Sequence, residues 1–273
     1  MTQKKDQPTN PFLIEGYVSP EYFCDREQET ALLTRHLTNG CNVALMAPRR
    51  IGKSGLVFNC FNQPLLRDAF HCIYIDIYET KNLDEFVYEF GKGILAELRP
   101  KGRKVWECLG DITRPDVTLD EIFAYLSQAE KPCLVAIDEF QTIANYPEKT
   151  VEAALRKRIQ QCHNAHFVFS GSKRHMVAQM FTSPSRPFYN SSAIMGLEPI
   201  DRQAYLEFAN RHLSRIGKEI SPEAFCFLYE AYDGVTWYIQ YVLNMLYSSH
   251  LAISTMMLYA SRLAIFLFSL SFQ

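Results

Sequence analysis

The amino-acid sequence predicts an α/β protein with a five-stranded parallel sheet, followed by a small helical lobe. Five apolar runs of strand length occur between residues 42 and 197, and most lack polar residues at alternate positions. Such runs are typical of strands buried on both faces of a parallel sheet. Helical patterns separate the runs, as in a doubly wound domain. The strand-like runs end before Pro199, so only helices are expected after it.

The predicted elements begin with an extended arm over residues 1–20, because prolines and a glycine punctuate this stretch. A helix is expected over 25–37, with Asp25 as its N-cap. The five strands are predicted at 42–46, 72–77, 133–137, 166–170 and 193–197.

Three further helical patterns lie between these strands. Apolar residues recur at helical spacing over 83–98, and another helix is expected over 151–162. Thr118 and Glu121 have the spacing of a capping box, which predicts that a helix begins at Thr118.

The lobe after Pro199 is predicted to contain helices over 201–216 and 221–232, with helical periodicity continuing over 237–246. Ser221 and Pro222 suit the cap and the first turn of the second helix. The expected division is therefore an arm (1–20), a main domain (21–200), a helical lid (201–247) and an apolar tail (248–273).

Composition excludes few classes of function. The formal net charge is -2, which gives no global reason to expect nucleic acid as the main ligand. The eight cysteines form no CxxC pair, so we expect reduced thiols rather than a metal site or disulfides. The first residues are polar and do not resemble a secretory signal, which favours a cytoplasmic location.

A phosphate-binding loop is the strongest motif in the sequence. It follows the first predicted strand, precedes a helical pattern and approximates G-x-x-x-x-G-K-[ST], with alanine at the first glycine position. Backbone N–H groups and a helix N-terminus in such a loop form an anion cradle. The predicted nucleotide-binding residues are Ala47, Pro48, Arg49, Arg50, Ile51, Gly52, Lys53, Ser54 and Gly55.

Within this loop the side chains are expected to have different roles. Lys53 neutralises the β and γ phosphates and acts in catalysis, and the Ser54 hydroxyl is a ligand of Mg²⁺. Arg49 and Arg50 are expected on the outside of the loop, either solvated or touching phosphate or a neighbouring copy of the chain.

Two acids, Asp138 and Glu139, follow the apolar run 133–137. A phosphate loop needs a carboxylate to hold Mg²⁺ through water, and Asp138 is placed for this role. Glu139 is predicted to act as the general base that polarises the attacking water. Adjacent Asp and Glu favour ATP hydrolysis, and the N-K-x-D base-recognition motif of small GTPases is absent.

The fourth strand ends in Ser170-Gly171-Ser172. A small polar residue here suits a sensor of the γ-phosphate, and Ser170 or Ser172 is a candidate; tight packing is the alternative for either. No motif identifies an arginine for transition-state charge. The cationic candidates are Arg156, Arg158, Lys173 and Arg174.

Together these motifs resemble the archaeal-type ATPase family, within the STAND and AAA-related P-loop ATPases. The matching segments are Phe23-x-Asp25-Arg26-Glu27-x-Glu29, the phosphate loop, Ile137-Asp138-Glu139 and Phe169-Ser170-Gly171-Ser172. The resemblance implies a sheet order of 5-1-4-3-2 and a helical lid. It also implies that Phe23 and Arg26 lie near the adenine.

The chain departs from the family at two places. No arginine follows the aromatic residues in 187–192, and the turn at Gly234 lacks the family's proline. The resemblance nevertheless implies an ATP-driven conformational switch that uses Mg²⁺ and acts on an unidentified protein partner, with a homo-oligomer left open.

Two alternatives remain open at this point. One is a scaffold that holds ATP with little turnover. The other is a DNA-associated initiator or transposition-helper ATPase. The only sequence feature that favours it is a basic cluster beside Trp106, formed by Arg99, Lys101, Arg103 and Lys104.

The tail is depleted in charge: after Gly234 the only Asp, Glu, Lys or Arg is Arg262. Residues 251–270 have the length of a membrane span, but Arg262 near its middle opposes insertion. We therefore expect an altered or truncated C-terminus that packs on the lobe or on another copy, rather than a membrane anchor.

Overall fold

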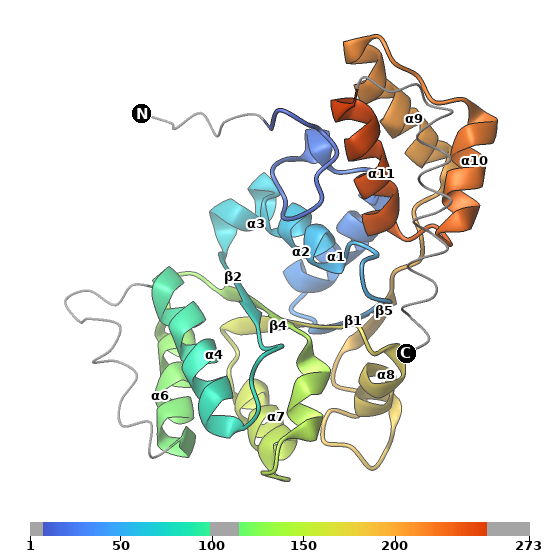
Figure 1. Cartoon of the computed structure of the whole chain (residues 1–273). Coiled ribbons are helices and arrows are strands. Elements are labelled where there is room, and N and C mark those ends of the chain that lie inside the picture. Colours follow the sequence, from blue (N-terminus) through green and yellow to red (C-terminus); the bar gives the residue numbers. More distant parts are fainter. Residues whose placement is uncertain (1–7, 99–114, 250–273) are drawn as a thin grey trace. The chain divides into compact units, whose positions relative to one another are not determined.

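A computed structural model describes residues 8–98 and 115–249, with side chains for all of them except 115–117. The described chain divides into two compact units (Figure 1). Unit 2 contains the sheet and comprises residues 28–49 and 56–197, apart from the gap at 99–114. Unit 1 comprises residues 8–27, 50–55 and 198–249. The domain boundaries expected from the sequence stay a prediction.

The sheet of unit 2 has five strands, all parallel, in the order β2-β3-β4-β1-β5. This is the predicted order 5-1-4-3-2 read from the other edge, so the predicted fold class is confirmed. The strands are β1 (Val43–Met46), β2 (His71–Asp76), β3 (Cys133–Asp138), β4 (Ala165–Gly171) and β5 (Ala193–Gly196).

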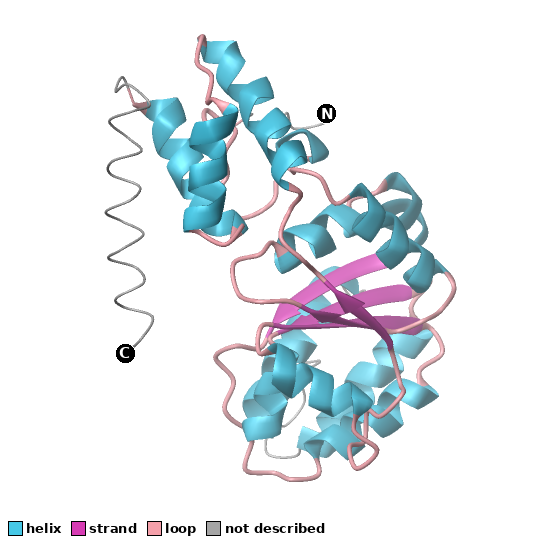
Figure 2. Cartoon of the chain, turned by 90° about the vertical axis from the view of Figure 1, so that its right-hand side faces the viewer, coloured by secondary structure: helices cyan, strands magenta, loops and turns pink. Residues whose placement is uncertain are grey.

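Burial explains the absence of polar alternation in the central strands. Every residue of β1 and β3 is buried, because helices cover both faces of the sheet (Figure 2). Figure 1 shows α1, α2 and α3 on one face and α4, α6 and α7 on the other. Phenylalanines form the centre of the core on the second face; Phe140 contacts Phe169, Phe181 and Phe188, all fully or almost fully buried.

The helices that belong wholly or mostly to unit 2 largely follow the predicted order. They are α1 (Glu27–Thr38), α2 (Lys53–Phe61), α3 (Pro64–Ala69), α4 (Leu83–Leu98), α6 (Pro115–Gln128), α7 (Val151–Gln161), α8 (Arg174–Thr182) and the 3-10 helix η2 (Phe140–Asn145). The short helices α3 and α8 were not predicted, since six and nine residues carry little periodicity.

Two predicted helix starts are wrong. Helix α6 begins at Pro115, so Thr118 lies inside the helix and does not cap it; proline is well suited to a first helical position. Helix α1 begins at Glu27, and Asp25 is not its cap. Asp25 and Arg26 both have positive φ, 55° and 79°, a conformation that is uncommon for residues other than glycine.

Unit 1 is helical, as expected for the region after Pro199. Its elements are η1 (Pro20–Tyr22), α9 (Arg202–Leu213), η3 (Ser214–Ile216), α10 (Pro222–Ala231) and α11 (Thr236–Ser248). The Asp201 carboxylate accepts from the backbone N–H groups of Gln203 and Ala204, and the Ser221 hydroxyl accepts from that of Ala224. These caps fix where α9 and α10 begin.

The segment expected as an arm contributes to the core of unit 1. Phe12 is fully buried and makes edge contacts with Phe208, His212 and Tyr247. The amide of Asn244 in α11 donates to the carbonyl oxygen of Phe12 at 2.8 Å. Residues near the start of the chain and α11 are thereby packed into one core.

His212 gives this core a pH dependence. Its ring is fully buried, and burial, aided by Arg215 and Arg211, lowers its pKa below 6.5 although the Glu21 carbonyl opposes this. A lowered pKa means that the unfolded chain binds the proton first, so stability falls as the pH drops below about 6.5.

We therefore expect wild-type protein to lose more unfolding free energy than His212→Gln between about pH 7.5 and about pH 5.5, measured by chemical denaturation. Glutamine keeps a donor for the Glu21 carbonyl, which His212 Nε2 contacts at 3.2 Å. Equal pH dependence in the two proteins would contradict this assignment.

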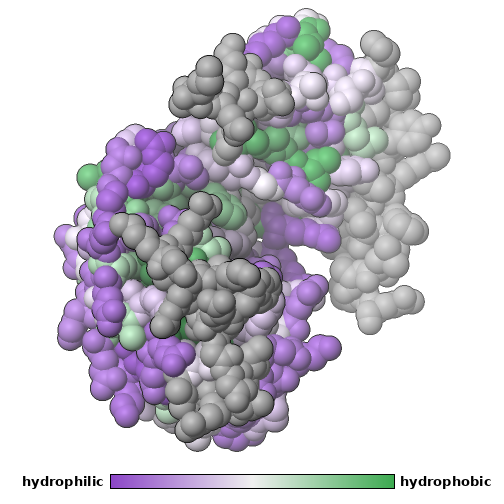
Figure 3. Space-filling view, turned by 90° about the vertical axis from the view of Figure 1, so that its left-hand side faces the viewer, coloured by the Kyte–Doolittle hydropathy of each residue, from purple (hydrophilic) through white to green (hydrophobic). Residues whose placement is uncertain are grey.

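Among residues 8–98 and 115–249, the structure has no helix that is both long and apolar enough to cross a membrane. Figure 3 shows a face of the molecule on which hydrophilic residues predominate. The apolar tail and the basic cluster around Trp106 lie outside the described residues, so the predictions made for them stay predictions.

Candidate functional site

The predicted phosphate loop connects β1, which ends at Met46, to α2, which begins at Lys53. The sequence therefore adopts the strand–loop–helix arrangement that the motif requires. Gly52 has a φ of +101°, and nothing lies within 4 Å of where a Cβ would be. It is this backbone conformation, and not lack of space, that calls for glycine there.

Lys53 and Ser54 are the first two residues of α2. Initial N–H groups of a helix have no partner within the helix, and the helix dipole favours an anion beside them. Lys53 is only 6% exposed although it carries a charge. A buried cation at a helix N-terminus is suited to phosphate, and Ser54 places a hydroxyl in the same first turn.

Two other predicted nucleotide-binding residues contact this loop within unit 1. The guanidinium of Arg26, 3% exposed, donates to the carbonyl oxygen of Ile51 at 3.4 Å. The ring of Phe23 lies 3.1 Å from where a Cβ of Gly55 would be. The structure thus brings Phe23 and Arg26 to the loop; their proximity to an adenine stays a prediction.

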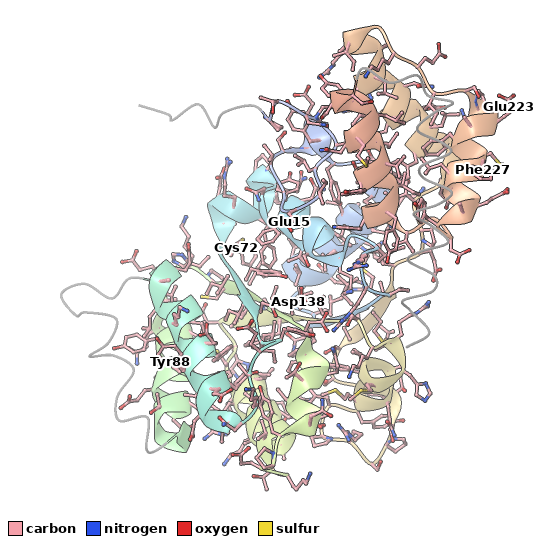
Figure 4. The ribbon with its side chains drawn as sticks, viewed as in Figure 1. Glu15, Cys72, Tyr88, Asp138, Glu223 and Phe227 are labelled. Carbon is pink, nitrogen blue, oxygen red and sulfur yellow. The ribbon has the colours of Figure 1, made fainter. Side chains whose placement is uncertain are left out.

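Asp138 ends β3 and is 6% exposed (Figure 4). One carboxylate oxygen accepts from the hydroxyl of Tyr74 on β2, and the other accepts from the backbone N–H of Glu139 at 2.9 Å. Each oxygen of this carboxylate therefore has a hydrogen-bond donor within unit 2.

Glu139 follows with a φ of +54°, a left-handed conformation that turns the chain away from the strand. Its Oε2 accepts from the Ser172 hydroxyl at 2.7 Å and from the side-chain amide of Gln141. Ser172 in turn accepts from Arg49 Nε at 3.3 Å. A chain of donors therefore connects the phosphate-loop residue Arg49 to the predicted general base.

Gln141 belongs to this network but was not predicted as a site residue. No motif marks it, because its position depends on how η2 returns along the sheet after Glu139. Gly171 leaves it room, since a Cβ there would collide with Gln141 and Val177. Of the two candidate sensors, Ser172 is the one that contacts Glu139.

Ser170, the other candidate sensor, is fully buried, and its hydroxyl has no hydrogen-bond partner within the described residues. Its role toward a γ-phosphate stays a prediction. Of the cationic candidates, Arg158 is ion-paired with Asp120 at 2.7 Å. Lys173 lines a pocket of about 560 Å³ together with Arg49, Tyr78 and Gln141, so it lies near the Glu139 network.

Asp76 was also missed by sequence reasoning. It pairs with Asp138 across β2 and β3, and its pKa is raised by desolvation and by the neighbouring carboxylates of Asp138 and Glu139. Asp76 and Asp138 therefore lie side by side at the carboxyl ends of β2 and β3, and Glu139 is the next residue after Asp138.

No group of three or more His, Cys, Asp or Glu residues suited to hold a metal ion by itself occurs in the described chain. Mg²⁺ is usually bound by one or two carboxylates together with substrate phosphates and water. Asp138, buried at the carboxyl end of β3, is a suitable residue to hold it.

Comparison with known proteins gives a likeness in structure only. No protein-family model matches the sequence, and no curated protein matches it. The Walker-type ATPase of Pyrococcus abyssi superposes with a TM-score of 0.76 at 19% identity, over 96% of this chain and 78% of that one.

Two Aeropyrum pernix proteins are also similar. ORC2, in ADPNP–ADP complexes, gives a TM-score of 0.67 at 16% identity, over 92% of this chain and 71% of that one. ORC1, in complex with DNA, gives a TM-score of 0.64 at 12% identity, over 94% of this chain and 69% of that one. At these identities the likeness shows the fold alone. The chain has the fold of the archaeal Walker-type P-loop ATPases, and the predicted resemblance is confirmed at that level.

Proposed function

We propose that this chain is an ATPase that binds Mg-ATP at residues 47–55 and hydrolyses its β–γ phosphoanhydride. The observation that carries this proposal is the position of the acids Asp138 and Glu139. Asp138 and Glu139 lie at the carboxyl end of β3. The strands are parallel, so β1 also ends on this side of the sheet, and the phosphate loop begins there. Ligands of open α/β sheets bind at the carboxyl ends of the strands.

Each residue has a distinct task in this proposal. Lys53 and the first N–H groups of α2 bind the phosphates. Ser54 and Asp138 hold Mg²⁺, which when bound neutralises charge on the phosphate oxygens. Glu139 accepts a proton from the attacking water, and Ser172 and Gln141 orient its carboxylate.

Removal of the metal tests this assignment. Asp138→Asn should raise the Mg²⁺ concentration needed for half-maximal phosphate release by roughly 10-fold or more, the usual effect of losing a group that orients metal-bound water. EDTA should abolish release in both proteins. Asp68→Asn, at an exposed aspartate on α3, is the matched control. Identical Mg²⁺ dependence in Asp138→Asn and Asp68→Asn would remove Asp138 from the site.

A scaffold that retains ATP is the second candidate. It is favoured by the two hydrogen bonds that already occupy Glu139 Oε2. Binding of Mg-ATP without any phosphate release by the wild-type chain would select the scaffold over the ATPase.

The remaining predictions stay proposals. They are the use of hydrolysis to drive a conformational switch, a protein partner, a homo-oligomer, a DNA-associated role and a cytoplasmic location.

A further inference from the structure

The first turn of α11 binds the backbone of the phosphate loop within unit 1. The N–H of Trp237 donates to the carbonyl oxygen of Arg50 at 3.0 Å. The Thr236 hydroxyl donates to the carbonyl oxygen of Ile51 at 3.2 Å, and Arg26 donates to the same oxygen at 3.4 Å. Two successive loop carbonyls are therefore held by groups outside the loop.

The Arg50 side chain makes a second set of contacts with the same turn. Its guanidinium lies 4.8 Å from the ring of Trp237 and 5.3 Å from that of Tyr238. It also donates to the Tyr238 hydroxyl at 2.6 Å. Each ring also stacks on a second ring, Tyr238 on Tyr232 and Trp237 on Tyr241. Arginine over such rings is attracted to their faces.

The position of this turn is set by the chain just before it. Gly234 has a φ of +66°, and a Cβ there would come within 2.7 Å of Pro199 and 2.8 Å of Tyr229. Only glycine fits, and the tight turn brings Thr236 and Trp237 to the loop. Arg50 itself has a φ of +66°, which its contacts with α11 help to maintain.

Peptide geometry connects these contacts to anion binding. In a trans peptide the C=O and the N–H point in opposite directions. The carbonyl of Arg50 and the N–H of Ile51 belong to one peptide plane, and the carbonyl of Ile51 and the N–H of Gly52 to the next. Because α11 and Arg26 hold both carbonyls, they turn both N–H groups to the opposite side of the loop.

We propose that binding of ATP phosphates and docking of α11 onto the loop are thermodynamically coupled through these two peptide planes, with Arg50 as the positioning residue that keeps α11 docked. This inference rests on the proposed function, since it takes the phosphates as the anion that the N–H groups meet. Coupling of this kind is reciprocal: whatever strengthens docking strengthens phosphate binding by the same factor.

The coupling predicts that hydrogen exchange in the first turn of α11 slows when wild-type protein binds Mg-AMP-PNP, a non-hydrolysable analogue of Mg-ATP. Hydrogen exchange at the Trp237 amide, followed by mass spectrometry on a peptide that contains it, should slow by roughly 5-fold or more, the lower range of allosteric coupling. Calorimetry on the same samples reports whether the analogue binds.

Variants at Tyr238 test the reciprocal effect, because Tyr238 lies on the lobe and outside the proposed binding residues. Tyr238→Leu removes both the ring and the hydroxyl and should weaken Mg-AMP-PNP binding by roughly 5-fold. Tyr238→Phe keeps the ring beneath Arg50 and should retain most of the affinity. Phe227→Leu is the control; Phe227 is 50% exposed on α10 of the same unit (Figure 4).

The outcomes separate the two proposals. If the analogue binds but exchange at Trp237 is unchanged, or if Tyr238→Leu binds as tightly as Phe227→Leu, coupling is refuted and the ATP-binding site stands. If wild-type protein binds no Mg-AMP-PNP, both proposals fail. Circular dichroism verifies that each variant is folded, and the exchange measurement on wild-type protein does not depend on any variant.

Discussion

Replacing Glu139 with glutamine is expected to lower the rate of ATP hydrolysis about 100-fold or more, because general base catalysis usually contributes 10²–10⁴. The affinity for Mg-ATP should stay the same. Glutamine has the shape of glutamate, and its carbonyl oxygen still accepts from the Ser172 hydroxyl, which lies 2.7 Å from Glu139 Oε2. What it loses is the ability to take a proton from water.

The measurement is steady-state phosphate release at saturating Mg-ATP, with binding followed separately by calorimetry. Glu130→Gln is the matched control, since Glu130 is an exposed acid that precedes β3, whereas Glu139 follows it. Equal rates in Glu139→Gln and Glu130→Gln would show that Glu139 is not the base.

Lys53→Ala is expected to weaken Mg-ATP binding 10-fold or more. Lys53 is 6% exposed at the start of α2, so its ammonium group is largely shielded from water. Loss of one hydrogen bond to a charged group typically costs about 1.5–3 kcal/mol, which corresponds to roughly this change in affinity.

Calorimetric titration of Mg-ATP into both proteins measures the effect. Lys157→Ala, at an exposed lysine on α7, controls for loss of a positive charge elsewhere. If Lys53→Ala and wild-type protein bind with the same affinity, the phosphate loop is not part of the nucleotide site.

The sheet and the phosphate loop could be predicted because they leave local signals. Strands buried on both faces read as continuous apolar runs, and Gly52-Lys53-Ser54 follows one such run directly. The order of the strands could not be predicted from hydrophobic periodicity, because periodicity does not indicate which strands are neighbours. The order was predicted from the family resemblance.

What could not be predicted depends on tertiary contacts. Asp25 looked like a helix cap, but it and Arg26 adopt positive φ, which no local pattern reveals for residues other than glycine. The Ser172–Glu139–Gln141 network exists only because β4 pairs with β3 and η2 turns back beside them. Arg50 was expected outside the loop, and it is exposed there, but its partners Trp237 and Tyr238 lie nearly 190 residues further along the chain.

The central claim is that this chain hydrolyses ATP at a site containing Glu139. A single-turnover experiment, with protein in excess over ATP labelled at the γ-phosphate, tests it most directly because every ATP molecule is bound. We predict that wild-type protein with Mg²⁺ converts the bound label to free phosphate, whereas Glu139→Gln retains it as ATP over the same time. Label that remains as ATP in both proteins, or is released equally fast by both, would contradict this account.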